Sequence, residues 1–180
     1  MRIRAQDSCL LIIDIQERLF PAIAEHAELA AHTLWLQQVA QRIGVPVLLT
    51  EQYSKGLGQT IASLRAGHAP EAIVEKLHFS AVSEGELLQR PGGERRQFVV
   101  CGSETHVCVL QSVLDLLEQG RAVFVVAEAV GSRRPADKQL ALQRMQQAGA
   151  VIVSREMVAF EWLEQAGSEL FRSISREFIR

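Results

Sequence analysis

The sequence has few of the features that mark membrane, secreted or nucleic-acid-binding proteins. Its continuous apolar runs, such as Cys9 to Ile13, are far too short to cross a bilayer. The opening residues, MRIRAQD, contain no signal-peptide core. Lysine and arginine form no block, and the formal net charge is -2. We therefore expect a protein with neither a membrane nor a nucleic acid as its partner.

Cysteine is also scarce. The three cysteines, Cys9, Cys101 and Cys108, are spaced neither as a disulfide framework nor as a paired C-x-x-C zinc site. Free thiols are typical of a reducing compartment, so we expect a cytoplasmic location. The 180 residues are 48% hydrophobic and 22% charged, and they contain no internal repeat or linker. This composition predicts one globular domain over residues 1–180.

Short apolar segments alternate with longer amphipathic ones. Strands are expected at Ser8–Asp14, Val45–Thr50, Ala72–Glu75, Gln97–Cys101, Ala122–Ala127 and Val151–Val153. Helices are expected at Ala27–Ile43, Ser83–Gln89, His106–Gln119 and Ala136–Ala148, and the tail, Ser154 to Arg180, is helical in pattern. Gly44, Gly120 and Gly149 each end a predicted helix just before a strand. This rhythm predicts right-handed βαβ units and a parallel sheet.

Ligands of an open parallel sheet collect beyond the carboxyl ends of its strands. Three reactive side chains follow predicted strands: Asp14, Lys76 and Cys108. The amides of a helix N-terminus and a nearby ammonium both favour a thiolate at Cys108. Asp14 would take the thiol proton and later pass it to a leaving nitrogen, while Lys76 holds the carboxylate. Attack on a carbonyl would then form a thioester that water hydrolyses.

Simpler interpretations of the same residues remain open. The V-C-V-L run around Cys108 also fits a buried helix face, because cysteine often packs as a small hydrophobe. Asp14 would cap a following turn, and Lys76 would be an ordinary solvated lysine. Gly56 and Gly58 do not form a phosphate-binding motif, so a flexible loop is favoured there.

Three segments together resemble the isochorismatase-like cysteine hydrolases. They are LLIIDIQERL (Leu10–Leu19), EKLHFSA (Glu75–Ala81) and VVCGSETHVCVLQSVLDLLEQG (Val99–Gly120). The stretch TEQYSKGLGQT (Thr50–Thr60) is similar to the subgroup called isochorismatase domain-containing proteins. The resemblance implies an α/β, three-layer, Rossmann-like fold with a six-stranded parallel sheet and helices on both faces. Relatives of this kind are usually oligomers, so a homo-oligomer, a dimer or tetramer, is expected.

The resemblance also assigns roles to residues. It implies a catalytic triad of Asp14, Lys76 and Cys108, a cis peptide between Ser103 and Glu104, and an oxyanion hole made of the Glu104 and Cys108 N–H groups. Such a cis bond costs roughly 3–4 kcal/mol and persists only where a fold enforces it. The substrate pocket is expected to include Gln16 and Leu19 by resemblance, and Tyr53, His78 and Phe79 by their position after strands.

Two departures from the patterns of individual family members reduce the number of reactions that we expect for this protein. Nicotinamidases of this family carry an Asp-x-His metal motif where this chain has Glu51-Gln52-Tyr53, so we expect no catalytic metal and no cofactor. True isochorismatases cleave a vinyl ether and lack the cysteine, so Cys108 favours hydrolysis of a C–N bond in a small amide or ureido compound. The alternatives are a non-catalytic binding protein of the same fold, a vinyl-ether hydrolase, or a redox sensor that uses Cys108.

Overall fold

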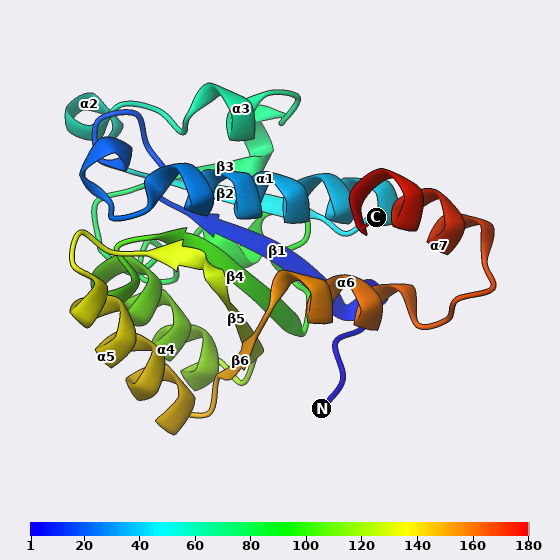
Figure 1. Ribbon diagram of the computed structural model, residues 1–180. Helices are drawn as coiled ribbons and strands as arrows, with labels where there is room; N and C mark the ends of the chain where they lie inside the picture. Colours follow the sequence, from blue (N-terminus) through cyan, green and yellow to red (C-terminus); the bar gives the residue numbers. More distant parts are fainter. Residues whose placement is uncertain (180) are drawn as a thin grey trace.

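A single sheet of six parallel strands forms the centre of the protein (Figure 1). The computed structural model describes residues 1–179. The strands are β1 (Ser8–Ile13), β2 (Val47–Gln52), β3 (Ile73–Lys76), β4 (Gln97–Ser103), β5 (Ala122–Gly131) and β6 (Val151–Val153). Their order is β3-β2-β1-β4-β5-β6, so the strand order reverses between β1 and β4. The predicted α/β fold with a six-stranded parallel sheet is confirmed.

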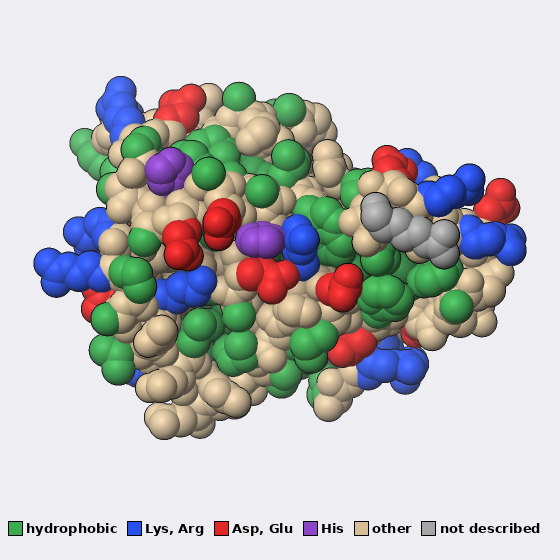
Figure 2. All heavy atoms as spheres, viewed as in Figure 1, with side chains coloured by type: hydrophobic (Ala, Val, Ile, Leu, Met, Phe, Trp, Pro, Cys, Tyr) green, Lys and Arg blue, Asp and Glu red, His purple; other side chains and the backbone are tan. Residues whose placement is uncertain are grey.

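Helices cover both faces of this sheet. They are α1 (His26–Ile43), α2 (Ser54–Leu57), α3 (Ala62–Arg65), α4 (Leu110–Glu118), α5 (Pro135–Gln147), α6 (Arg155–Leu163) and α7 (Glu169–Ile174). Figure 1 shows α1 and α6 on one face, and α4 and α5 on the other. Acidic and basic side chains are interspersed over the face seen in Figure 2. Within residues 1–179, no helix is both long and apolar enough to cross a bilayer.

The core has two halves, one on each side of the sheet. In β1, Leu10 and Ile12 face the half that contains α1 and α6. Cys9, Leu11 and Ile13 face the half that contains α4 and α5. All five are buried, as expected for a strand covered on both faces. Burial of each leucine or isoleucine stabilises the fold by about 1.5–3 kcal/mol, which makes the central strands a firm base for the residues that follow them.

The predicted helix over Ser83–Gln89 is wrong. Only a 3₁₀ turn at Leu87–Gln89 forms there, and Gly85 adopts the left-handed conformation with φ +82°. The Glu84 carboxylate accepts hydrogen bonds from the N–H groups of Leu77 and His78, with an N···O distance of 2.7 Å to His78. These bonds fold the segment back on itself, so β3 and β4 are joined without an α-helix.

The tail packs on its own chain. The predicted helical stretch is divided into α6, α7 and a π-helical turn at Ser175–Ile179, and its last residue, Arg180, lies outside the described residues. The Trp162 indole donates a hydrogen bond of 3.0 Å to the hydroxyl of Ser8. Ile174 is fully buried in the core half that contains α1. The tail therefore completes the core of this chain.

Candidate active site

The three predicted catalytic residues meet at the carboxyl edge of the sheet. Asp14 directly follows β1, and Cys108 lies in the turn that leads from β4 into α4. β1 and β4 are neighbours at the point where strand order reverses, which is where open α/β sheets bind their ligands. Lys76 is the last residue of β3, and its long side chain reaches Asp14.

Asp14 and Lys76 form a buried ion pair. The distance between Lys76 Nζ and Asp14 Oδ2 is 2.7 Å, and neither side chain has exposed surface. Lys76 Nζ also donates to the side-chain oxygen of Gln52 at 2.6 Å and to the carbonyl of Phe79 at 3.0 Å. A buried ammonium is tolerated only when it is paired and hydrogen-bonded, and these acceptors meet that requirement.

The Asp14 carboxylate is held at its other oxygen as well. Thr50 Oγ1 donates to Asp14 Oδ1 over 2.6 Å, and the Asp14 N–H donates to the Thr50 carbonyl over 3.2 Å. Asp14 itself adopts a left-handed conformation with φ +53°, an uncommon state for a residue other than glycine. The strand neighbour thus fixes the direction in which the carboxylate points.

Cys108 lies against this pair in a π-helical turn, Thr105–Val109, that precedes α4. The Asp14 carboxylate and the Lys76 ammonium both lie close enough to act electrostatically on its thiol. Burial, followed by the negative charge of Asp14, raises the pKa of Cys108 to about 12, although the Lys76 ammonium acts in the opposite direction. The thiolate expected from the sequence is therefore wrong for the resting site, because burial and the carboxylate outweigh the ammonium. Burial therefore favours the protonated thiol, with the Asp14 carboxylate beside it.

The turn before Cys108 contains no cis peptide. Cis peptide bonds are absent from residues 1–179, so the predicted cis bond between Ser103 and Glu104 is wrong. The chain reverses instead through a left-handed residue, Glu104, at φ +56°. The Glu104 carbonyl accepts hydrogen bonds from the N–H groups of Val107 and Val109. The oxyanion role of the Glu104 and Cys108 N–H groups stays a prediction.

Gly102 brings this turn close to β1. Its φ is +150°, and a Cβ at this position would overlap the carbonyl oxygen of Ile13, the residue before Asp14. The pairing of β4 with β5 also shifts its register between Val100 and Gly102, as a β-bulge does. The glycine therefore allows the cysteine-bearing turn to approach the strand that carries the aspartate.

Polar side chains also contact one another around this turn. Glu104 is buried, and its Oε1 accepts from Arg133 Nε at 2.8 Å. His106 Nδ1 lies 3.0 Å from Ser132 Oγ and 3.3 Å from Glu104 Oε2. The hydroxyl of Ser103 is buried without a hydrogen-bond partner among the described residues.

The segment after Lys76 is attached to α4. The hydroxyls of Ser80 and Ser83 both donate to the Asp115 carboxylate, at 2.6 and 3.0 Å. The Ser112 hydroxyl accepts from the Ala81 N–H at 2.9 Å and donates to the Cys108 carbonyl at 2.7 Å. The lysine and cysteine ends of the site are therefore connected by side-chain hydrogen bonds.

The structure gives the predicted pocket residues different positions. Gln16 is fully buried, and its Nε2 donates to the carbonyls of Gln52 and Gly58 at 2.9 and 2.7 Å, so it ties the loop after β2 to β2. Leu19 is half-buried and packs against the core. His78 and Phe79 are exposed, and His78 Nδ1 lies 2.9 Å from Glu84 Oε1.

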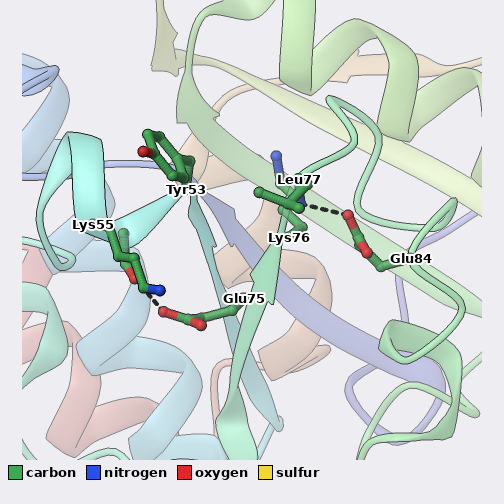
Figure 3. A pocket seen from close by; sticks show the side chains of 7 residues that line it. Tyr53, Lys55, Glu75, Lys76, Leu77 and Glu84 are labelled. Atoms are coloured by element: carbon green, nitrogen blue, oxygen red, sulfur yellow. Dashed lines mark hydrogen bonds between the residues drawn. The ribbon is translucent and has the colours of Figure 1, made fainter.

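A cavity of about 360 Å³ lies beside Lys76. It is lined by Tyr53, Ser54, Lys55, Glu75, Lys76, Leu77 and Glu84. Figure 3 shows Tyr53 and Leu77 on opposite sides of this hollow, with Glu75 bonded to Ser54 and Glu84 to the Leu77 backbone. Asp14 and Cys108 do not line this cavity, and Cys108 is only 5% exposed. The Cys108 thiol is thus covered.

Comparisons with known proteins identify the family of this chain. The family model described as the isochorismatase domain matches residues 8–157. The chain belongs to the isochorismatase family. Isochorismatase domain-containing protein 2A of Mus musculus is 35% identical over 176 residues, which cover 97% of this chain and 84% of the mouse protein.

Solved structures of isochorismatase-like proteins share the fold. The MAR1 ribonuclease of Caenorhabditis elegans is 31% identical, with a TM-score of 0.87 over 98% of this chain and 91% of that chain. YcaC of Pseudomonas aeruginosa, whose structure contains hexane-2,5-diol and covalent acrylamide, is 25% identical, with a TM-score of 0.87 over 99% of this chain and 92% of that chain. The resemblance to the isochorismatase family inferred from the sequence is confirmed.

Thr50 and Gln52 are the residues of this isochorismatase-like site that sequence reasoning missed. Thr50 pairs with Ile13 in the parallel register of β1 and β2, which places it beside Asp14. Gln52 pairs with Lys76 in the register of β2 and β3. A signal was present, because both are polar residues at the end of an apolar strand. No three His, Cys, Asp or Glu side chains gather as metal ligands in residues 1–179, and the metal-free reaction stays a prediction.

Proposed function

We propose that this isochorismatase-family protein is a metal-independent cysteine hydrolase that cleaves a C–N bond of a small amide or ureido compound. One observation carries the proposal: Cys108 lies beside the Asp14 carboxylate, whose charge acts on the thiol, and Asp14 is paired with Lys76 at 2.7 Å with both charged side chains buried. A nucleophile beside a base, with the base held by a third group, is the arrangement that covalent hydrolysis needs.

Acylation begins when the sulfur of Cys108 forms a bond to the substrate carbonyl carbon while its proton moves to Asp14. Because the pKa of Cys108 is about 12, the proton leaves as the bond forms rather than beforehand. The electron pair of the carbonyl moves onto oxygen, where the N–H groups of Glu104 and Cys108 stabilise it. Asp14 then protonates the leaving nitrogen, the C–N bond breaks, and a thioester remains.

Deacylation uses the same residues with water. Asp14 removes a proton from a water molecule that attacks the thioester carbonyl, and the C–S bond then breaks. The sulfur regains its proton from Asp14, and the acid product leaves. Lys76 remains an ammonium throughout and keeps the carboxylate oriented through its 2.7 Å contact.

A panel of small amides, carbamoyl and ureido compounds tests this function. We expect release of ammonia or an amine from at least one compound, and an acyl adduct by mass spectrometry that is lost in Cys108→Ala. Cys101→Ala is the matched control, because Cys101 is a buried thiol inside β4 and lies outside the site. Equal adduct formation in Cys108→Ala would overturn the assignment of the nucleophile.

A non-catalytic binding protein is the second candidate, and the covered, protonated thiol favours it. It predicts that no panel member is cleaved, although ligands still raise the melting temperature. A short RNA belongs in the panel as well, since the Caenorhabditis elegans relative is described as a ribonuclease. Cleavage of RNA with no cleavage of amides would replace the proposed substrate class.

We also propose that the chain forms a homo-oligomer and works in the cytoplasm. Leu77 and Phe79 are 71% and 52% exposed beside the site, which supports a contact with a second copy. All three cysteines are free and buried, which supports a reducing compartment. Light scattering on the purified chain tests the first point, and a single-chain mass would contradict it.

A further inference from the structure

A second cavity lies at the opposite edge of the sheet from Cys108. Its volume is about 690 Å³, and its lining includes Arg2, Arg4, Asp7, Arg96, Gln97 and Arg121. Gln97 is the first residue of β4, whereas Cys108 follows the other end of that strand. Because each strand residue advances the chain by about 3.3 Å, the two sites are roughly 20 Å apart. The cavity is therefore separate from the candidate active site.

The lining concentrates positive charge on a protein whose net charge is -2. The lining contains four arginines and only one carboxylate, that of Asp7. Arg4 and Arg96 are exposed and form no ion pair with any described residue. Arg2 has only a loose contact of 3.7 Å with Glu164.

The arginines are presented from a fixed backbone. Gln97 is buried, its Nε2 donates to the Arg2 carbonyl at 3.0 Å, and its Oε1 accepts from the Arg4 N–H at 2.7 Å. Ile3 between them is fully buried, which anchors the segment to the core. Arg2 and Arg4 are thereby held on either side of a residue that faces inward.

Arg121 is held more firmly still. Its Nη1 donates to the carbonyls of Glu94 and Arg95, both at 2.9 Å. Its Nε is buried without a hydrogen-bond partner among the described residues. An unpaired buried N–H of a charged group is costly, and the Arg121 side chain that carries it lines the cavity.

We propose that this cavity binds a small molecule with two or more linked phosphate groups. The guanidinium fork matches two phosphate oxygens at once, and several arginines fit a ligand with several charged groups better than a single phosphate. The volume is within the range of small-molecule sites. No aromatic side chain lines the cavity, so recognition rests on the phosphates and does not need a stacked base. The site is independent of the proposed hydrolase reaction.

Isothermal titration of the full chain with inorganic triphosphate at low salt tests the proposal. We expect one site per chain, with affinity that decreases from triphosphate to pyrophosphate to phosphate, and that falls as salt is added. The double variant Arg4→Gln/Arg96→Gln should weaken binding at least tenfold. Both side chains are exposed, so the variant should fold, which a thermal melt verifies. Arg121→Gln is a second variant and should weaken binding as well.

Arg144→Gln is the matched control, since Arg144 is an exposed arginine on α5 outside the cavity, and its affinity should stay within twofold of the parent. Cys108→Ala should bind as the parent does, which keeps this test separate from the hydrolase assignment. Titration with a nucleoside triphosphate identifies the source of the phosphates: tighter binding than triphosphate indicates a nucleotide, and equal binding a free polyphosphate. Absence of binding by the parent, equal loss in Arg144→Gln, or binding of a short RNA without triphosphate would overturn the proposal.

Discussion

At the scale of single residues, the site depends on how one carboxylate is shared. Asp14 accepts a hydrogen bond from Thr50 at one oxygen and pairs with Lys76 at the other. Burial, and then the charge of Asp14, raise the pKa of the Cys108 thiol. A carboxylate held in this way is oriented before substrate arrives, which removes a cost of reorganisation from the reaction. Thr50 is thus a positioning residue for the proposed base.

Thr50→Val tests that role. The valine removes the 2.6 Å hydrogen bond and keeps the shape, so Asp14 loses its orientation and kcat for a cleaved substrate should fall on the order of tenfold, which equals about 1.4 kcal/mol. KM should change less than twofold, because Thr50 acts through Asp14.

Thr33→Val is the control for Thr50→Val. Thr33 is equally buried, but its hydroxyl donates to the Leu29 carbonyl of its own helix at 2.8 Å, far from the site in the chain. Both variants should lose stability, and only Thr50→Val should lose turnover. An equal fall of kcat in both, or in neither, would contradict the positioning role.

At the scale of elements, the important contact is between β1 and the turn that follows β4. Gly102→Ala places a Cβ against the Ile13 carbonyl and requires a side chain at φ +150°, so it should cost about 2–4 kcal/mol of the free energy of unfolding and reduce turnover. Gly149→Ala is the control, with φ +110° and no atom within 4 Å of the added Cβ, and should cost about 1–2 kcal/mol with turnover kept. Urea unfolding measures both, and equal losses would refute the close approach.

The elements also show how far the sequence could predict the structure. Apolar runs that end in glycine or a polar residue located all six strands to within a few residues, and thereby located Asp14, Lys76 and Cys108. The predicted helix at Ser83–Gln89 was wrong because Ser83 donates a hydrogen bond to Asp115 and Glu84 accepts one from the backbone after β3. The short helices α2 and α3 were missed because one turn has too little periodicity to detect.

Some features of the site needed three-dimensional information. Burial of the Cys108 thiol reverses the pKa shift expected from a nearby lysine, and depth below the surface cannot be read from a motif. The same holds for the left-handed Glu104, whose conformation replaces the cis bond implied by resemblance. The position of the Arg2–Arg4 segment likewise depends on hydrogen bonds to the Gln97 side chain, which is 95 residues away from Arg2 in the sequence.

At the scale of the whole molecule, three buried thiols make stability depend on alkaline pH. Burial raises the pKa of Cys9 and Cys108 to about 12 and that of Cys101 further, from the usual 9.0. The folded chain therefore keeps thiol protons that the unfolded chain loses above about pH 9. This contribution to stability is complete below about pH 9 and is lost as the pH rises toward about 12, at about 1.4 kcal/mol per pH unit for each thiol.

The variant Cys101→Ala measures how much one buried thiol contributes to the pH dependence of the free energy of unfolding. Urea unfolding in a reductant between about pH 9 and about pH 11 should give a slope that is shallower than the parent's by about 1.4 kcal/mol per pH unit. The loss of the sulfur lowers stability equally at every pH, so only the slope reports ionisation. Parallel curves for the two proteins would show that Cys101 does not titrate differently on unfolding.

The hydrogen bonds that join the Ser80–Ser83 segment to α4 have a mechanical consequence. A substrate that reaches the covered sulfur of Cys108 must displace some of the residues above it. A displacement that separated the Lys76 ammonium from the Cys108 thiol would disrupt the proposed catalytic site. The Ser112 hydroxyl bonds to both the Ala81 N–H and the Cys108 carbonyl. We therefore expect an outward movement of Ala81 to be accompanied by movement of Cys108. Movement of the Ser80–Ser83 segment would then widen access to the sulfur, and Cys108 would keep its distance from the segment that follows Lys76.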